Sequence, residues 1–513
     1  MRIGTGKANL KFADGVGLFG FGPGGGRGVN VPLGSDDHDI LEARALYLEH
    51  GDQKLMVVSF DVASGSRVVH RALLEALTEA GINLSAGQLW VVGTHTHSAP
   101  GHSWSNLYDL FGQGPFGYRN VVVTELVRKG LAAAKATHAD LRECHLGVAQ
   151  EVLWGPARNR SLRPFLANFG GDPTRWPVDV GIAPPPTLDL TPEQRCVDPR
   201  LTVIAFVAPE GEHLATWATW CCHPATFPRS SQRAFHRDWP GVAVDRLERE
   251  TGAFAMIHQG ANGDVTPLPS GERRVTHAIE RVRDLGDQIG SAWLRGLSAA
   301  ASRAAATTFE LGFRTFTPRE EPLPTFEIGA SVIAGSEESD PGGLTRMIGE
   351  ARRWPWRGGP QQPKLLALGP LQPLARLHPA LRPSPEHPMW LLRLGSHLFF
   401  ASPFEQSTCA ARTTELALRK RWSTIRQEDI TASPVGLVGD YAGYLTTPEE
   451  FALQNYEGGH TLYGRDQLAI MGRIWADLIT SEPLDANGPA FQSEEKTLHA
   501  RVADALALLA SDP

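Results

Sequence analysis

The chain has 513 residues, of which 42% are hydrophobic and 20% charged, which is typical of a globular protein with one large domain or two. Its net charge of −7 argues against a nucleic-acid partner, because phosphate binding needs a basic surface. The five cysteines are too scattered for a disulfide framework, and the sequence has no apolar signal segment and no membrane-spanning apolar run, so we expect a cytoplasmic protein.

Strand and helix signals alternate over the first 310 residues. The apolar run Leu55–Asp61 predicts a buried strand, Arg67–Ala80 has apolar residues at helical spacing, and Leu89–Gly93 predicts a second strand. This order predicts a parallel crossover unit and therefore an α/β domain. Farther along, Leu201–Val207 and Leu214–Trp220 flank a turn and predict a hairpin.

The rest of the chain continues the mixture of strands and helices. The further strands are expected at Phe254–Ile257, Trp390–Leu394 and His397–Phe400. The further helices are expected at His277–Ala305, Thr408–Arg421, Asp466–Leu478 and Glu494–Ala510. We therefore expect the fold class to be α/β: one large domain, with mixed β-sheets flanked by helices.

Two stretches rich in proline and glycine interrupt this pattern, at about residues 164–199 and 335–388. Long irregular segments in a compact domain form either lids beside a site or surface decoration. We expect residues 1–480 to form the domain, with these two stretches as insertions, and residues 481–513 to form a helical extension.

The sharpest local motif is Gly93-Thr-His-Thr-His-Ser98, directly after an apolar strand. Residues two apart in a strand point to the same face, so His95 and His97 are expected to line one pocket. Imidazoles presented at a strand end are common zinc ligands. The alternative is a pair of exposed histidines at a loop edge.

Three weaker signals occur farther along the chain, and the first two of them follow strands. His223 comes after Leu214–Trp220, and Glu405 follows the apolar Phe399-Phe400. The tyrosines of Asp440–Tyr444 and the neighbouring Tyr456 form a third group, which is more often core with polar tips. Together these residues supply two imidazoles from separate strands, a carboxylate and phenols, a set that suits a catalytic zinc with one position left to water.

Sequence motifs for other kinds of site match this chain poorly. The glycine-rich segment Gly20–Gly28 lacks the Gly-Lys-Ser/Thr end of a phosphate loop, and its proline breaks the dinucleotide fingerprint. We expect this loop to approach the pocket closely. A serine-hydrolase elbow is unsupported because Gly-x-Ser-x-Gly is absent around Ser64-Gly65-Ser66.

The order of these motifs over about residues 1–480 resembles the neutral ceramidases. The motifs that match are Gly93–Gly101, Asn159-Arg-Ser161, His223, Gly263-Asp-Val265, Pro403-Phe-Glu405, Tyr444–Glu450 and Tyr456–Gly464. The family hydrolyses the amide bond of N-acylsphingosine at a single zinc, so the resemblance implies a zinc amidohydrolase acting on a small-molecule amide.

The resemblance also implies roles for individual residues. The positions of the family's zinc ligands are occupied here by His95, His223, Glu405 and Tyr444. The positions that line the site and hold the substrate's polar atoms are occupied by His97, Arg160 and Tyr456. We expect His97 to transfer a proton, Tyr456 to donate to the developing oxyanion, and Arg160 to anchor a hydroxyl or carboxylate of the substrate.

The sequence departs from the family in four respects. The family's Ser-Asp-Asn element corresponds here to Phe235–Gly241, which keeps Asp238 as a site residue but has no serine. This favours a zinc-activated water over a serine nucleophile. The family's C-terminal β-sandwich domain is also expected to be missing, since the residues after Thr480 are few and read as helical. Both of these departures slightly favour a non-catalytic protein that keeps the fold as a binding module. Third, members of the family are usually secreted or membrane-attached, whereas no signal sequence is visible here. Fourth, the stretches at about residues 164–199 and 335–388 show no resemblance to the family, and they are the regions expected to shape substrate access. We expect a substrate other than ceramide.

Several alternatives stay open at this stage. The same site can cleave an ester or lactam, or run in reverse as an N-acyltransferase, because all three reactions pass through a similar tetrahedral intermediate. A non-catalytic binding protein on this scaffold and an iron oxygenase with two histidines and one carboxylate are the remaining alternatives. The sequence does not determine the oligomeric state.

Overall fold

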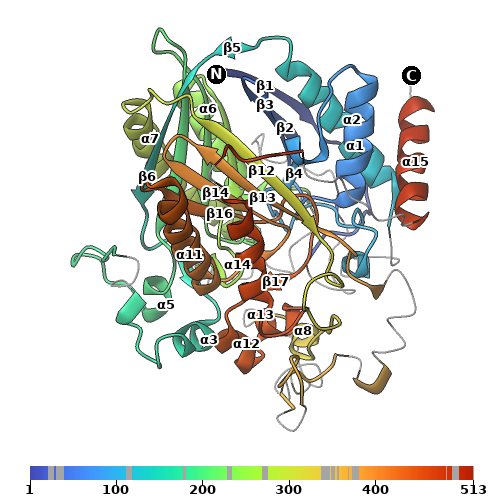
Figure 1. Ribbon diagram of the computed structural model, residues 1–513, viewed down its shortest axis with the longest axis vertical. Helices are drawn as coiled ribbons and strands as arrows, with labels where there is room; N and C mark the ends of the chain where they lie inside the picture. Colours follow the sequence, from blue (N-terminus) through green and yellow to red (C-terminus); the bar gives the residue numbers. More distant parts are fainter. Residues whose placement is uncertain are drawn as a thin grey trace.

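Three β-sheets of four or five strands form the centre of the described structure, and each contains one parallel strand pair joined through a helix (Figure 1). The structure is a computed structural model. It describes residues 1–20, 28–29, 40–110, 118–176, 181–227, 234–268, 275–336, 347, 353–354, 358–367, 369–371, 381–480, 482–487 and 496–511. The expectation of an α/β fold with mixed sheets flanked by helices is confirmed.

The first sheet has the strand order β4-β3-β2-β1-β5. Its strands are β1 (Arg2–Asn9), β2 (Glu42–His50), β3 (Gln53–Phe60), β4 (Leu89–Gly93) and β5 (Arg142–Glu143). Strands β3 and β4 are parallel and are connected through helix α1 (Arg67–Glu79), so the predicted crossover unit is confirmed. The apolar run of β3 is buried on both faces: Met56 and Val58 pack under α1, whereas Leu55 and Val57 face the interior of the protein.

The second sheet has the order β10-β9-β8-β6. Its strands are β6 (His145–Val152), β8 (Arg200–Val207), β9 (His213–Trp220) and β10 (Phe254–Gln259). The β8–β9 hairpin is antiparallel, as predicted, and β9 runs parallel to β10 through helix α6 (Asp238–Thr251). Helix α6 ends at Gly252, whose φ of 69° is the left-handed conformation that glycine adopts readily. The predicted long helix is α7 (Val275–Ala301), which packs on the outer face of this sheet together with α6.

The third sheet has the order β12-β13-β14-β16. Its strands are β12 (Phe309–Phe316), β13 (His387–Leu394), β14 (His397–Ala401) and β16 (Thr431–Val435). Strand β14 pairs in parallel with β16 through helix α11 (Thr408–Arg426), whose first turn is capped by the Ser407 side chain. Helix α11 and helix α14 (Gln467–Leu478) cover the outer face of the sheet.

The inner faces of the three sheets meet in one aromatic core. Trp90 from β4 lies against Trp217 from β9 and Trp390 from β13, with ring centroids 5.8 and 5.9 Å apart. Trp217 in turn stacks on Phe399 of β14, at 5.4 Å and an interplanar angle of 11°. These side chains are at most 1% exposed, so the relative placement of the sheets is fixed by close packing at their centre.

The expected C-terminal helix is present as α15 (Lys496–Ser511). It lies beside α1 and α2 (Asn120–Thr137), and Leu498, Val502 and Ala505 complete the apolar core on the outer face of the first sheet (Figure 1). No helix among the described residues is both long and apolar enough to cross a membrane.

Short elements connect the sheets and surround the site. The two-stranded sheets pair β7 (Ala157–Asn159) with β11 (Val265–Pro267) and β15 (Glu405–Gln406) with β17 (Tyr444–Leu445). The short helices are α3 (Leu162–Ala167), α5 (Pro192–Arg195), α8 (Ser331–Ala334), α12 (Pro448–Leu453), α13 (Tyr456–His460) and the 3-10 turns η3 (Ala86–Gln88), η4 (Leu107–Leu110) and η5 (Gly369–Leu371).

Both proline- and glycine-rich stretches are anchored to the domain where the structure describes them. Trp176 and Cys196 of the first stretch pack against Cys409 at the start of α11. In the second, the Lys364 ammonium donates to the carbonyl oxygens of Glu327 and Thr461, at 2.9 and 2.7 Å. Much of the second stretch, part of the first and residues 21–27 of the glycine-rich segment lie outside the described residues, so a lid role stays a prediction.

Candidate metal centre

The site residues follow the carboxyl ends of one strand in each of the three sheets. His95 and His97 come after β4, His223 comes after β9, and Glu405 comes after β14. Each of these strands belongs to a parallel pair, and the crevice beyond the carboxyl ends of such strands is where open α/β sheets place their ligands. The segments therefore converge on one place although they are far apart in sequence.

The two histidines of the His-x-His motif meet for a reason other than the one expected from sequence. Strand β4 ends at Gly93, and His95 has a φ of 73°, which is a left-handed backbone conformation and not an extended one. The expectation that strand alternation places both side chains on one face is therefore wrong in its geometry. His95 and His97 nevertheless lie together, with ring centroids 4.9 Å apart.

Backbone carbonyls fix the orientation of two of the imidazoles. Nδ1 of His95 lies 2.6 Å from the carbonyl oxygen of Ala63, and Nδ1 of His223 lies 2.9 Å from that of Val265. Because a carbonyl oxygen only accepts, both Nδ1 atoms must carry the hydrogen. The lone pair of each Nε2 is then available to a metal, which is the usual arrangement of metal-binding histidines.

Glu405 lies between these two histidines. Its Oε2 is 2.9 Å from Nε2 of His223 and 3.4 Å from Nε2 of His95, and all three side chains are about 1% exposed. Zinc–ligand bonds of about 2.0–2.1 Å in tetrahedral geometry place ligand atoms about 3.3 Å from one another. The observed separations agree with that value, so the three atoms can share one ion.

The protonation states favour a cation at this point. Burial lowers the pKa of His223 to about 4, so its imidazole is neutral at pH 7. Burial opposes ionisation of Glu405, but the adjacent His95 and His223 outweigh it and hold the pKa of the carboxyl well below its usual range. Nε2 of His95 and Oε2 of Glu405 are buried without a well-formed hydrogen bond. Since such atoms are costly to bury unsatisfied, the donor set fits a bound metal ion.

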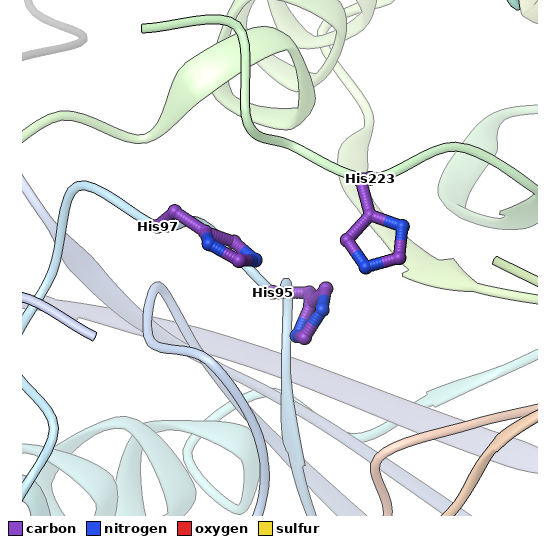
Figure 2. Close-up of side chains that lie close together, drawn as sticks. All are labelled: His95, His97 and His223. Atoms are coloured by element: carbon purple, nitrogen blue, oxygen red, sulfur yellow. The ribbon is translucent and has the colours of Figure 1, made fainter. Parts of the chain in front are cut away.

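His97 belongs to the same cluster. One ligand nitrogen from each of His95, His97 and His223 can be chosen so that all lie within 4.8 Å of one another, and Figure 2 shows the three rings facing a common space. His97 is the more exposed of the three, and burial lowers its pKa well below the ordinary histidine value. Sequence reasoning expected it to transfer protons, whereas this geometry also suits a third nitrogen ligand.

Arg160, Tyr444 and Tyr456 contact one another. The Arg160 Nη2 donates to the Tyr444 hydroxyl at 3.1 Å and to the Gly263 carbonyl at 2.7 Å. Tyr456 hydrogen-bonds to Tyr444, and its ring lies under the Arg160 guanidinium at 5.6 Å. Tyr444 pairs with Glu405 in the register of β15 and β17, which places it next to the candidate ligands.

Asp238 occupies a different environment. It is fully buried at the start of α6 and accepts hydrogen bonds from the Thr226 hydroxyl and the Trp239 backbone, both at 2.7 Å. Its own N–H donates to Nδ1 of His236 at 2.7 Å. These contacts hold the segment behind His223, since the Trp239 indole donates to the His223 carbonyl at 3.4 Å. A direct catalytic role for Asp238 stays a prediction.

Sequence reasoning gave no individual role to two residues that contact the site. Glu457 accepts from Nε of Arg160 at 3.1 Å and from the Ser161 hydroxyl at 2.7 Å. Tyr441 donates to Oε1 of Glu405 at 2.6 Å. Both stand within motifs that the sequence singled out, Glu457 directly after Tyr456 and Tyr441 three residues before Tyr444. Position in a motif was the available signal, but the partner of each residue is distant in sequence.

Comparison with known proteins identifies the family of the chain. The family model "Neutral/alkaline non-lysosomal ceramidase, N-terminal" matches residues 38–274 and 353–472, together more than two-thirds of the chain. Neutral ceramidases of Mycobacterium tuberculosis and Pseudomonas aeruginosa are 26% and 25% identical. Each alignment covers 93% of this chain, with 76% and 71% of the relative's own length.

Solved structures share the fold. A ceramidase complexed with C2 superposes with a TM-score of 0.72 at 21% identity, covering 96% of this chain and 78% of that one. The neutral ceramidase from Pseudomonas aeruginosa gives a TM-score of 0.71 at 21% identity, covering 94% and 76%. The resemblance drawn from the motifs is therefore confirmed, and the chain belongs to the neutral/alkaline non-lysosomal ceramidase family.

Proposed function

We propose that this protein is a zinc-dependent amidohydrolase that cleaves the N-acyl bond of a small amide other than ceramide. The observation that supports this most strongly is the convergence of Nε2 of His95 and of His223 on Oε2 of Glu405, with both Nδ1 atoms engaged by carbonyl oxygens. Family membership supports the class of reaction, and the absence of the family's serine in Phe235–Gly241 supports attack by water.

His95, His223 and Glu405 would hold the metal, with Tyr444 or His97 completing its ligands. Zinc at such a site supplies a Lewis acid for the amide carbonyl and lowers the pKa of a water molecule to about 7. The ligands come from three sheets that pack tightly together, so their positions are set before substrate arrives.

Two residues of the chain would handle the proton and the developing charge. The lowered pKa of His97 keeps its imidazole neutral, so that a ring nitrogen can accept the proton of the attacking water and return it to the leaving amine. Burial raises the pKa of Tyr456, so its phenol keeps its hydrogen and can donate to the oxyanion.

Arg160 would act chiefly by holding Tyr444. Its Nε and Nη2 atoms are engaged by Glu457, by the Gly263 carbonyl and by the Tyr444 hydroxyl. A guanidinium tied in this way orients the phenol next to Glu405 and forms one wall of the site. Anchoring of a substrate hydroxyl or carboxylate by Arg160 stays a prediction.

Elemental analysis of the purified protein tests the metal. We expect about one zinc per chain, lost in both His95→Ala and Glu405→Ala while the circular dichroism spectrum is unchanged. His213→Ala is the matched control, because His213 stands at the opposite end of β9 from His223 and should leave the zinc in place. Absence of metal, with none taken up on zinc titration, would overturn the hydrolase proposal.

A panel of N-acyl amides, each paired with its matched ester and including ceramide, tests the reaction. We expect the zinc-loaded protein to cleave a subset of the amides and His95→Ala to cleave none. Cleavage of esters alone would make it an esterase. Ceramide as the best substrate of the panel would contradict the expected substrate class and leave the zinc site intact.

A further inference from the structure

Tyr441 contacts the side of Glu405 that faces away from the histidines. Its hydroxyl donates to Oε1 at 2.6 Å, whereas Oε2 lies 2.9 Å from His223 and 3.4 Å from His95. The two oxygens of one carboxylate thus have separate partners. A hydrogen bond from a phenol to a carboxylate is a strong, directional contact, so it restricts rotation of the Glu405 side chain.

Aromatic neighbours hold the Tyr441 ring in place. Tyr108 packs edge-on at a centroid distance of 4.4 Å, Phe19 does so at 5.8 Å, and Trp104 lies at 6.0 Å. Tyr441 itself is 4% exposed. A ring enclosed in this way has one rotamer available, so its hydroxyl is presented at a fixed position.

The backbone on both sides of the contact is also fixed. The Ala442 N–H donates to the Pro403 carbonyl at 3.0 Å, and the Glu405 N–H donates to the Gly443 carbonyl at 2.9 Å. Gly443 has a φ of 77°, and a Cβ at this position would lie 2.3 Å from the Tyr108 hydroxyl. The loop that holds Tyr441 therefore wraps closely around the segment that holds Glu405, and glycine is required where it turns.

We propose that Tyr441 is a positioning residue of the metal centre: it holds Oε1 of Glu405 so that Oε2 alone is presented to the point shared by His95 and His223. This inference rests on the proposed zinc site. The bond leaves the carboxylate as a ligand through one oxygen, which suits a four-coordinate ion better than a freely rotating side chain would.

The zinc dissociation constant of Tyr441→Phe, measured by competition with a chromophoric chelator, tests this role without reference to activity. The variant keeps the ring packing and removes the hydroxyl. We expect its dissociation constant to rise about 10–100-fold, the usual effect of losing an outer partner of a metal ligand. Tyr463→Phe is the control, because it also loses a buried hydroxyl, bonded to Nε2 of His387 at 2.9 Å, and should bind zinc as the parent protein does.

A double-mutant cycle shows whether Tyr441 acts through Glu405. In a Glu405→Ala background, where zinc binding is weakened and is measured by titration, adding Tyr441→Phe should change the zinc dissociation constant by less than about 3-fold, because no acceptor for the Tyr441 hydroxyl remains at position 405. The inference is overturned if Tyr441→Phe binds zinc like the parent protein, or if it weakens binding equally in both backgrounds. Failure of the parent protein itself to bind zinc would overturn the proposed function as well.

Discussion

His97 can act either in proton transfer or as a metal ligand. Because Gly20 contacts its imidazole, the substitution Gly20→Ala distinguishes these two roles. Gly20 has a φ of 97°, and a Cβ built on it would lie 2.2 Å from Nδ1 and 2.6 Å from Cε1 of His97. Ordinary contacts of a Cβ are 3.4–4 Å, so Gly20→Ala must displace the imidazole or the loop by about 1 Å. A displacement of that size at a reacting group costs about 10²-fold in rate.

The assay pairs kcat/KM on the best amide of the panel with the zinc dissociation constant. If His97 transfers protons, Gly20→Ala lowers kcat/KM about 100-fold and leaves zinc affinity nearly unchanged. If His97 is a metal ligand, both quantities fall together. Gly15→Ala is the matched control, because Gly15 has a φ of 84° with nothing within 4 Å of the added Cβ, so it introduces the backbone strain alone, about 1–2 kcal/mol.

The reasoning fails under either of two results. Gly20→Ala with unchanged turnover and unchanged zinc affinity would show that His97 is not held by this contact. An equal loss of turnover in Gly15→Ala would show that strain in the N-terminal loop, and not displacement of the imidazole, is responsible.

Three further predictions concern the stability of the fold and the contact between Glu457 and Arg160. His258 is buried and has no hydrogen-bond partner for either ring nitrogen among the described residues. Burial lowers its pKa to about 3, below the value of about 6.5 in the unfolded chain. Because the unfolded chain then binds a proton more readily than the folded protein, the free energy of unfolding falls as the pH drops below 6.5, by about 2 kcal/mol at pH 5. Urea unfolding at pH 7.5 and 5.0 should show a smaller acid-induced loss in His258→Leu, and an equal loss would contradict this. Trp217→Ala should cost about 3–5 kcal/mol in the same assay, against less than about 0.5 kcal/mol for the half-exposed Trp354→Ala. Glu457→Gln, which weakens the hold on Arg160, should lower turnover while zinc stays bound, and loss of zinc instead would place Arg160 among the groups needed for metal binding.

The sequence predicted the elements of the sheets well because their signals are local. The run Leu55–Phe60 is apolar except for Ser59 because β3 is buried on both faces, and the helix that follows has the spacing of a one-sided apolar surface. The residues at strand ends were found for the same reason: an apolar run stops and a histidine or carboxylate follows it. Which ends meet in space depends on how the sheets pack, and no local pattern reports that.

The errors and omissions at the site have the same origin. The His-x-His pair was assigned to strand alternation, but the left-handed backbone at His95 is imposed by contacts with the segment around Val62 and Ala63, which precedes it by more than 30 residues. Tyr441 and Glu457 act on Glu405 and Arg160 through contacts between distant parts of the chain. A polar side chain inside a motif gives no sign of its partner until the fold is known.

Division of the site among three sheets links metal binding to their packing. His95, His223 and Glu405 each follow a strand of a different sheet, and the core beneath them is formed by Trp90, Trp217 and Phe399 of those same strands. An ion bound by all three sheets stabilises only the state in which they are docked, by about 2.7 kcal/mol when free zinc is 100 times its dissociation constant. Zinc should therefore slow amide hydrogen exchange in β4, β9 and β14 together, measured on chelator-treated and zinc-loaded protein. Slowing in one of these strands alone would mean that the ion does not bridge the sheets, and the ligand set proposed here would be wrong.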